Sequence, residues 1–238
     1  QWSQVALPTC CDAGSIFSMY TSSDYLYLGF YANGVYKSSN SGDSWTQLIH
    51  SPQNTVHALA GTPANTNLLY LAVVSPYKTI DGGETWDYIP NYHNEVCITG
   101  YVTTIAINSQ NSDIVLSGDD AQCVMRTTDG GVTWKDVYVN VGVEQVLFDP
   151  ANPSVAYLNA KVVGVFHDGI LRSSDAGETW TAYNDGLPSW SIRGFDIGPG
   201  EVGKPSVLYA GMPYNGIYTT APSASLPYSV FIPLVIKP

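Results

Sequence analysis

Short apolar runs separated by turn-forming residues repeat along the whole chain. The runs are rich in Val, Ile, Leu and Tyr, and Gly, Pro, Asn, Asp and Ser lie between them. In one unit the runs are Val56–Ala60, Leu68–Val74, Pro76–Thr79 and Trp86–Ile89. No segment shows the 3.6-residue periodicity of an amphipathic helix. The pattern therefore predicts an all-β protein built from four-stranded units.

The same set of runs recurs in other parts of the sequence. Matching runs lie within Ile16–Trp45, Val102–Trp134 and Glu144–Trp180, and each is followed by an outer strand. A fifth set, within residues 193–220, has three runs only. Radial repetition of four-stranded sheets is the design of a β-propeller. We therefore expect a five-bladed β-propeller over residues 1–220.

An eight-residue motif ending in tryptophan closes each of the first four units. Its tryptophans are 41, 48 and 46 residues apart, a spacing typical of repeat architectures. The third motif residue is Asn or Asp, and the fifth is Gly. The motifs are Ser38–Trp45 with Asn40, Thr79–Trp86 with Asp81, Thr127–Trp134 with Asp129, and Ser173–Trp180 with Asp175.

This motif resembles the Asp-box, or BNR repeat, of sialidases, sortilin-type receptors, xyloglucan-cleaving hydrolases and photosystem assembly factors. The resemblance implies a propeller of the sialidase/sortilin-like superfamily, of secreted bacterial type, with a hairpin turn between the third and fourth strands of each blade. An Asp side chain can accept hydrogen bonds from the amides of its own turn, and Gly supplies positive φ. Because the same residues recur in every unit, we interpret them as structural rather than catalytic.

The N-terminus continues the tryptophan spacing. Trp2 lies 43 residues before Trp45, and residues 3–5 mirror residues 46–48. The fifth unit lacks both the motif and its tryptophan. We therefore expect Gln1–Leu7 to form the outer strand of the fifth blade and close the ring. In the alternative arrangement the C-terminal segment supplies that strand and residues 1–7 form an additional arm.

The net charge and the first residue of the chain restrict the possible functions and location of the protein. The net charge is −11, and the nine basic residues do not cluster. Nucleic-acid binding requires a basic stripe that neutralises phosphates, so this class is excluded. No segment is long enough for a transmembrane helix. Because the chain begins with Gln1, we expect a removed signal peptide and an extracellular or cell-surface location.

The four cysteines predict disulfides in an exported protein. They are Cys10, Cys11, Cys97 and Cys123. Three connectivities are possible, and we favour links from the adjacent pair to Cys97 and Cys123. A zinc site is the alternative, but the spacing fits no familiar ligand pattern. No metal or other cofactor is expected.

The sequence does not single out a catalytic site. A sialidase-like site needs three arginines, whereas Arg126 and Arg172 precede motifs and leave only Arg193. Glycosidases need two facing carboxylates, and the spacing of the acids outside the motifs defines no pair. We therefore expect no catalysis. Trp190 beside Arg193 is a possible ligand face for a sugar or a protein. The acids outside the motifs are Glu95, Asp119, Asp120, Glu144, Asp168 and Asp196.

Residues 221–238 form a separate segment, a Pro/Ser linker followed by an apolar strand. The apolar side chains would be unfavourable in water, so we expect them to add a strand to a neighbouring molecule or to fold back on the propeller. The main expectation is a secreted, non-catalytic subunit that self-associates into an extracellular filament or surface assembly. The alternative is a glycan-binding or glycoside-hydrolase-like propeller, and a membrane-complex assembly factor rests on the resemblance alone. The apolar residues are Phe231, Ile232, Leu234, Val235 and Ile236.

Overall fold

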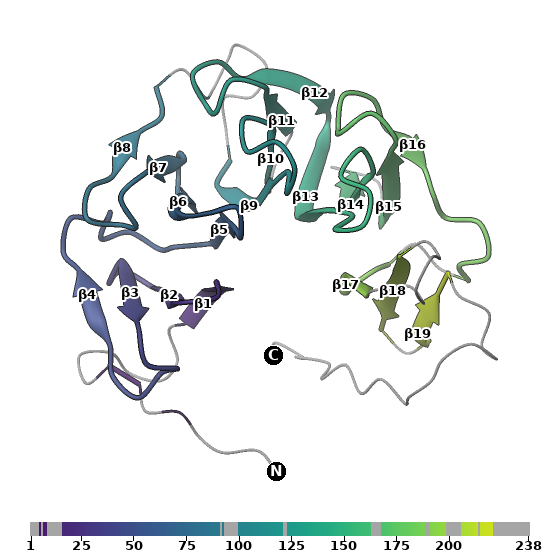
Figure 1. Cartoon of the computed structure of the whole chain (residues 1–238). Coiled ribbons are helices and arrows are strands. Elements are labelled where there is room, and N and C mark those ends of the chain that lie inside the picture. Colours follow the sequence, from purple (N-terminus) through teal and green to yellow (C-terminus); the bar gives the residue numbers. More distant parts are fainter. Residues whose placement is uncertain are drawn as a thin grey trace.

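The computed structural model contains strands and turns, and its five antiparallel sheets are arranged around a centre (Figure 1). It describes residues 5, 7–8, 16–90, 92, 100–120, 123–162, 168–188, 191–198, 206–213 and 215–220, with the side chains of residues 162 and 168 left aside. The prediction of an all-β, five-bladed propeller is confirmed. Across these residues there is no helix that could cross a membrane.

Each of the first four blades is a meander of four strands, and the fifth has three described strands. Blade 1 contains β1 (Ile16–Thr21), β2 (Leu26–Phe30), β3 (Val35–Ser38) and β4 (Thr46–Leu48); blade 2 contains β5 (Ala58–Thr62), β6 (Asn65–Ala72), β7 (Tyr77–Thr79) and β8 (Asp87–Tyr88). Blade 3 contains β9 (Val102–Ile107), β10 (Val115–Asp119), β11 (Cys123–Thr127) and β12 (Lys135–Val139); blade 4 contains β13 (Val141–Phe148), β14 (Ala156–Val162), β15 (Asp168–Ser173) and β16 (Thr181–Ala182). Blade 5 contains β17 (Gly194–Gly198), β18 (Val207–Met212) and β19 (Gly216–Thr219).

The hydrophobic core lies between neighbouring blades. In blades 2 and 3 the second strand is buried on both faces between adjacent sheets, which explains its nearly continuous apolar sequence. In β6, for example, Leu69, Tyr70 and Leu71 are completely buried. Tyr70 packs towards blade 3 in a cluster that includes Val102 and Met125. Contacts between sheets therefore hold the ring together, and the innermost strands β1, β5, β9, β13 and β17 surround its centre (Figure 1).

The eight-residue motifs form tight turns between the third and fourth strands. Asp129 accepts hydrogen bonds from the Thr133 amide (2.9 Å) and the Thr127 hydroxyl (2.7 Å). The Thr127 hydroxyl in turn accepts the amide of Gly131 (3.0 Å), whose φ is +93°. These bonds agree with a structural role for the motif carboxylates. The fourth motif residue also has positive φ, even where it is Ala176 (φ 55°), and the sequence pattern did not indicate this.

The hydrogen bonds of the motif predict acid-sensitive stability. Bonds from the side chain and amide of Thr133, then from the Thr127 hydroxyl, hold the pKa of Asp129 at about 2. Because the unfolded value is about 3.9, the ionised carboxylate stabilises the fold at neutral pH. This contribution is lost as the pH falls from about 4 to about 2. We expect Asp129→Asn to lower the melting temperature at pH 7 but not at pH 2, as measured by circular dichroism.

Blade 1 provides a natural control for this substitution. Its motif has Asn40, whose Oδ1 accepts the Ser44 amide at 2.9 Å, so an amide fits the turn. The difference between wild type and Asp129→Asn therefore reports the charge. An equal difference in melting temperature at both pH values would contradict the prediction.

Closure of the ring by Gln1–Leu7 stays a prediction, because residues 1–4, including Trp2, lie outside the described residues. Two described residues of that segment contact blade 1. A Cβ on Gly42 would lie 2.5 Å from Val5, just as a Cβ on Gly83 would lie 2.4 Å from Leu48. Leu48 belongs to β4, the outer strand of blade 1, and it packs on the motif glycine of blade 2. Val5 packs on the motif glycine of blade 1 in the same way. This placement agrees with an outer strand at the N-terminus.

Candidate functional site

Five equivalent positions, one in each blade, lie near the start of the innermost strands. Strand pairing defines them. The next residue in each blade pairs with an equivalent residue of the second strand, and these partners are Gly29, Ala72, Gly118, Asn159 and Gly211. We call these five residues the inner ring. Its members are Phe17, His57, Thr103, Glu144 and Arg193.

The inner ring combines a repeated geometry with varied chemistry. At Phe17, Thr103 and Glu144 the pairing register shifts, which marks a β-bulge. Bulges redirect side chains and are common beside active sites. The scaffold motifs repeat the same residue types, whereas this ring carries an aromatic ring, an imidazole, a hydroxyl, a carboxylate and a guanidinium. The Thr103 hydroxyl serves the scaffold, because it donates to the Gly118 and Val143 carbonyls. The other four members have no repeated scaffold role, so the inner ring is the centre of the candidate site.

A row of aromatic side chains extends from the inner ring across blades 1 to 3. The ring centroids of Tyr31 and Phe17 are 6.0 Å apart, those of Phe17 and His57 are 6.1 Å apart, and those of His57 and Tyr101 are 5.7 Å apart. Phe17, Tyr31 and Tyr101 are 43%, 57% and 52% exposed. The row lines a groove of about 480 Å³ that also includes Gln53 and Asn54. Exposed aromatic faces beside side-chain amides suit a ligand with apolar faces and polar edges.

Asp120 lies where this aromatic row ends, next to Tyr101. Asp120 accepts the Tyr101 amide at 2.8 Å and donates its own amide to the Tyr101 carbonyl at 3.1 Å. A Cβ on Gly142 would lie 2.6 Å from the Asp120 carbonyl oxygen, so β13 passes directly beside Asp120. Glu144 follows two residues later, roughly 7 Å along the strand. The fold therefore places Asp120 beside β13, the strand that carries Glu144.

The Glu144 side chain is held by the next strand of its blade. Asn159 Nδ2 donates to Glu144 Oε2 at 3.1 Å and to the Ile192 carbonyl of blade 5 at 3.1 Å. The same amide therefore orients the carboxylate and bridges two blades. Arg193 comes directly after Ile192, is exposed, and donates its amide to the Gly211 carbonyl at 2.9 Å. A carboxylate and a guanidinium thus occupy neighbouring positions of the ring.

The other predicted acids have different surroundings. Asp119 is 1% exposed and accepts the Cys123 amide at 3.0 Å, so it is a buried structural group rather than a solvated turn residue. Asp196 is exposed on β17. Glu95 and the side chain of Asp168 lie outside the described residues.

Several other predicted residues cannot be placed. Trp190 and the apolar residues 231–236 lie outside the described residues. Cys123 is buried and disulfide-bonded. Its pairing stays a prediction, because Cys10, Cys11 and Cys97 also lie outside. The described part of the chain contains no group of three His, Cys, Asp or Glu side chains that could hold a metal ion.

Sequence reasoning missed Phe17, Tyr31, His57 and Tyr101 as site residues. A signal for the inner ring was present, because a Val or Ile precedes each member, as in Val56-His57 and Val143-Glu144. If the five units are aligned in sequence on this Val or Ile instead of on the tryptophan, the inner-ring residues share one alignment position. Tyr31 follows β2 and Tyr101 precedes β9, so the two residues do not occupy equivalent positions of the repeat. Their place in the row is therefore visible only in the folded structure.

Comparisons with known proteins find xyloglucan-cleaving enzymes among the proteins similar to this chain, and no family model matches it. The oligoxyloglucan-reducing end-specific xyloglucanase of Emericella nidulans is 25% identical over 240 residues. That alignment covers 88% of this chain and 29% of the fungal protein. Among solved structures, the GH74 enzyme of Niastella koreensis aligns with a TM-score of 0.65 and 22% identity, covering 87% of this chain and 35% of that one. The GH74 xyloglucanase of Xanthomonas campestris gives 0.63 and 19%, with 89% and 35% covered.

These comparisons correct the main functional expectation. The chain was expected to be a non-catalytic subunit of a filament or surface assembly, but the curated relative is an enzyme. The spacing of acids along the sequence was a poor guide, because the fold, and not the sequence interval, places Asp120 beside the strand that carries Glu144. The chain spans less than a third of the length of its fungal relative. What the comparisons show is a β-propeller similar to those of xyloglucan-cleaving enzymes.

Proposed function

We propose that the chain is a glycoside-hydrolase-like propeller that binds a glucan chain along the aromatic row and cleaves it at Asp120 and Glu144. The observation that carries this proposal is the aromatic row itself, since four rings in sequence lead to Asp120, which lies beside the strand that carries Glu144. The similarity to the fungal xyloglucanase supports a xyloglucan-type ligand.

Each part of the site has a chemical role in this proposal. The faces of Tyr31, Phe17 and Tyr101 stack on sugar rings, and the amides of Gln53 and Asn54 bond to hydroxyl groups at the groove edge. One carboxyl group protonates the oxygen of the leaving sugar, and the other, as a carboxylate, activates water or attacks the anomeric carbon.

Two further expectations belong to this proposal. We propose that the four eight-residue turns are Asp-boxes, on the support of their hydrogen bonds and paired positive φ values. We also propose an exported protein, because the disulfide at Cys123 suits an oxidising compartment.

Binding of xyloglucan oligosaccharides tests the proposed function. Loss of one stacking ring should cost about 1 kcal/mol, so Tyr31→Ala and Tyr101→Ala should each weaken binding about fivefold or more in isothermal titration calorimetry. Tyr88→Ala is the matched control, because Tyr88 is 53% exposed but lies on the outermost strand of blade 2. No binding by the wild type, or an equal loss in Tyr88→Ala, would overturn the proposal.

A further inference from the structure

A motif tryptophan fills each junction between neighbouring blades from blade 1 to blade 4. Trp86 of blade 2 packs against the hydrophobic cluster between blades 1 and 2, and Trp134 of blade 3 packs against the cluster between blades 2 and 3. Trp180 of blade 4 belongs to the cluster between blades 3 and 4. Among the described residues, the cluster between blades 4 and 5 contains no tryptophan. The junction of blades 4 and 5 therefore differs from the other three.

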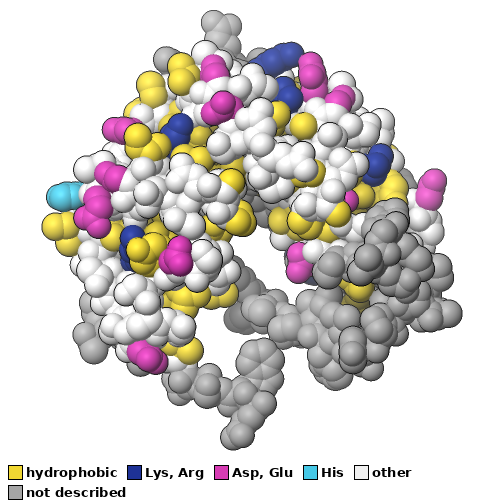
Figure 2. Space-filling model, viewed as in Figure 1, with side chains coloured by type: hydrophobic (Ala, Val, Ile, Leu, Met, Phe, Trp, Pro, Cys, Tyr) yellow, Lys and Arg dark blue, Asp and Glu magenta, His cyan; other side chains and the backbone are white. Residues whose placement is uncertain are grey.

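A pocket of about 390 Å³ opens in the junction between blades 4 and 5. On the visible face of the first four blades, exposed apolar side chains lie among polar and charged ones (Figure 2). In this pocket they are gathered. The apolar and aromatic lining comes from β15 and the residue after β16 in blade 4, and from β18 and β19 in blade 5. The main lining residues are Ile170, Tyr183, Leu208, Ala210 and Tyr218.

Strand pairing shows that this pocket corresponds to the place where Trp86 packs between blades 1 and 2. The five main lining residues correspond, in the order given, to Val35, Leu48, Leu69, Leu71 and Tyr77. Those five residues belong to, or pack against, the cluster that Trp86 joins. The walls that hold a tryptophan between blades 1 and 2 are therefore repeated between blades 4 and 5.

One wall of the pocket is uncovered where its counterparts are buried. Leu48 and Ile89 hold the equivalent position in blades 1 and 2 and are 6% and 4% exposed, whereas Tyr183 is 40% exposed. The motif of the next blade covers Leu48, since a Cβ on Gly83 would lie 2.4 Å from Leu48 and 3.5 Å from Trp86. Covering an exposed aromatic face with a second aromatic ring is favourable. The pocket therefore suits an indole.

The sequence contains one further tryptophan in the register of the motifs. Trp2 lies three residues before Val5, just as Trp45 lies three residues before Leu48. An odd spacing places two side chains on opposite faces of a strand. In the repeat, the first residue of such a pair packs in the junction with the preceding blade, and the second packs on the following blade.

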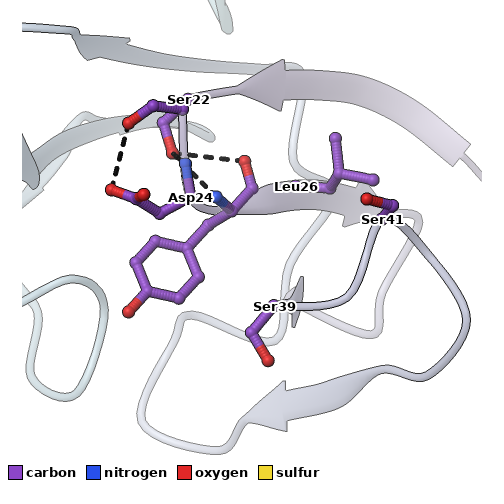
Figure 3. Close-up of a pocket in the computed structure, with 7 residues that line it drawn as sticks. Ser22, Asp24, Leu26, Ser39 and Ser41 are labelled. Atoms are coloured by element: carbon purple, nitrogen blue, oxygen red, sulfur yellow. Dashed lines mark hydrogen bonds between the residues drawn. The ribbon is translucent and has the colours of Figure 1, made fainter.

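The described residue Val5 fixes one end of this arrangement. A Cβ on Gly42 would lie 2.5 Å from Val5 and 3.7 Å from Leu26. Figure 3 shows the surroundings of this contact, with Ser41, which directly precedes Gly42, beside Leu26 at the start of β2. Because Val5 packs on blade 1, the blade that precedes it in the ring is blade 5. The junction that corresponds to Trp2 is therefore the one between blades 4 and 5.

We propose that this pocket, the junction pocket, binds the indole of Trp2, so that residues 1–7 connect blade 5 to both of its neighbours. Val5 contacts blade 1, and Trp2 packs between blades 4 and 5. The same two blades are bridged by Asn159, whose side-chain amide donates to the Ile192 carbonyl at 3.1 Å. The junction pocket shares no residue with the aromatic row, so this inference does not rest on the proposed function.

An NMR measurement on the full chain locates the indole of Trp2. Trp2→Phe identifies its indole N–H signal by removing it. We expect nuclear Overhauser contacts from this indole to the methyl groups of Leu208 and Ala210. Trp190→Phe is the matched control, because Trp190 is the other tryptophan outside the four motifs. Its indole should show no contact with either methyl group.

Free indole provides a second test, by rescue of a truncated side chain. We expect Trp2→Ala to lower the melting temperature by about 5–15 °C, as for the loss of a large aromatic side chain. Indole should then raise the melting temperature of Trp2→Ala, because a ligand that binds only the folded state stabilises it. The wild type, with its junction pocket filled, should not respond to indole.

Three results would overturn the proposal. The first is the lack of contacts from Trp2 to Leu208 and Ala210, or contacts from Trp190 in their place. The second is an equal effect of indole on the wild type and Trp2→Ala. The third is a dimer, detected by light scattering, that becomes a monomer in Trp2→Ala, since this would assign the junction pocket to Trp2 of a second copy.

Discussion

Glu144→Gln is expected to lower the rate of xyloglucan oligosaccharide hydrolysis by about 10²–10⁴-fold, the usual contribution of a general acid or base. The amide keeps the size of the side chain and can still bond to Asn159, which holds Glu144 at 3.1 Å. The substitution therefore removes the proton-transfer or nucleophilic function while the aromatic row stays intact. Release of reducing sugar measures the loss, and calorimetry with the same oligosaccharide should give an affinity within about twofold of the wild type.

Glu178→Gln is the matched control for this prediction. Glu178 is an exposed acid in the motif of blade 4, away from the inner ring, and its substitution should leave the rate unchanged. Hydrolysis by Glu144→Gln at the wild-type rate would remove Glu144 from the chemistry. A wild-type chain that binds the oligosaccharide without cleaving it would contradict the catalytic part of the proposal and leave the binding part standing.

Gly118→Ala is expected to destabilise the protein by about 1–3 kcal/mol, the usual cost of overpacking a core. A Cβ at Gly118 would lie 2.4 Å from the Cβ of Val143 in the next blade. A Cβ atom cannot rotate away, so β13 has to move as a whole. For a chain of this length the melting temperature should fall by about 3–10 °C, as measured by calorimetry or circular dichroism.

The same substitution should also impair the site, because Val143 directly precedes Glu144. Gly194→Ala is the control: a Cβ on Gly194 meets no atom within 4 Å, so its melting temperature should stay close to that of the wild type. The idea of a tight contact between blades 3 and 4 fails if Gly118→Ala and Gly194→Ala melt at the same temperature.

Position 118 shows how the blades differ within a repeated frame. The equivalent residue is Gly29 in blade 1, where a Cβ would lie 2.4 Å from Val56, and Ala72 in blade 2. In blade 4 it is Asn159, whose amide crosses to the Ile192 carbonyl at 3.1 Å. The junction between blades 4 and 5 therefore accommodates a polar side chain, and that side chain is the one that orients Glu144.

Local sequence determined the repeat, the strand type and the motif turns. Each of these depends on interactions within a few residues, such as the bonds from Thr127 and Thr133 to Asp129, so a regular pattern predicts them directly. The number of blades followed from the same pattern, because each unit contributes one such set of apolar runs to the ring. The basic residue before the motif was also readable as scaffold, as Arg126 shows.

Only the tertiary structure decided which residues form the site. Tyr31, His57, Tyr101 and Glu144 belong to four different blades and have no fixed spacing in the chain. Their proximity depends on how the sheets pack around the centre, and on the passage of β13 beside Asp120. The interval between two acids in the sequence gives no information on their separation across blades, which is why the sequence favoured a non-catalytic protein. Motifs within one turn are encoded locally, whereas a site shared between blades exists only after the blades have packed.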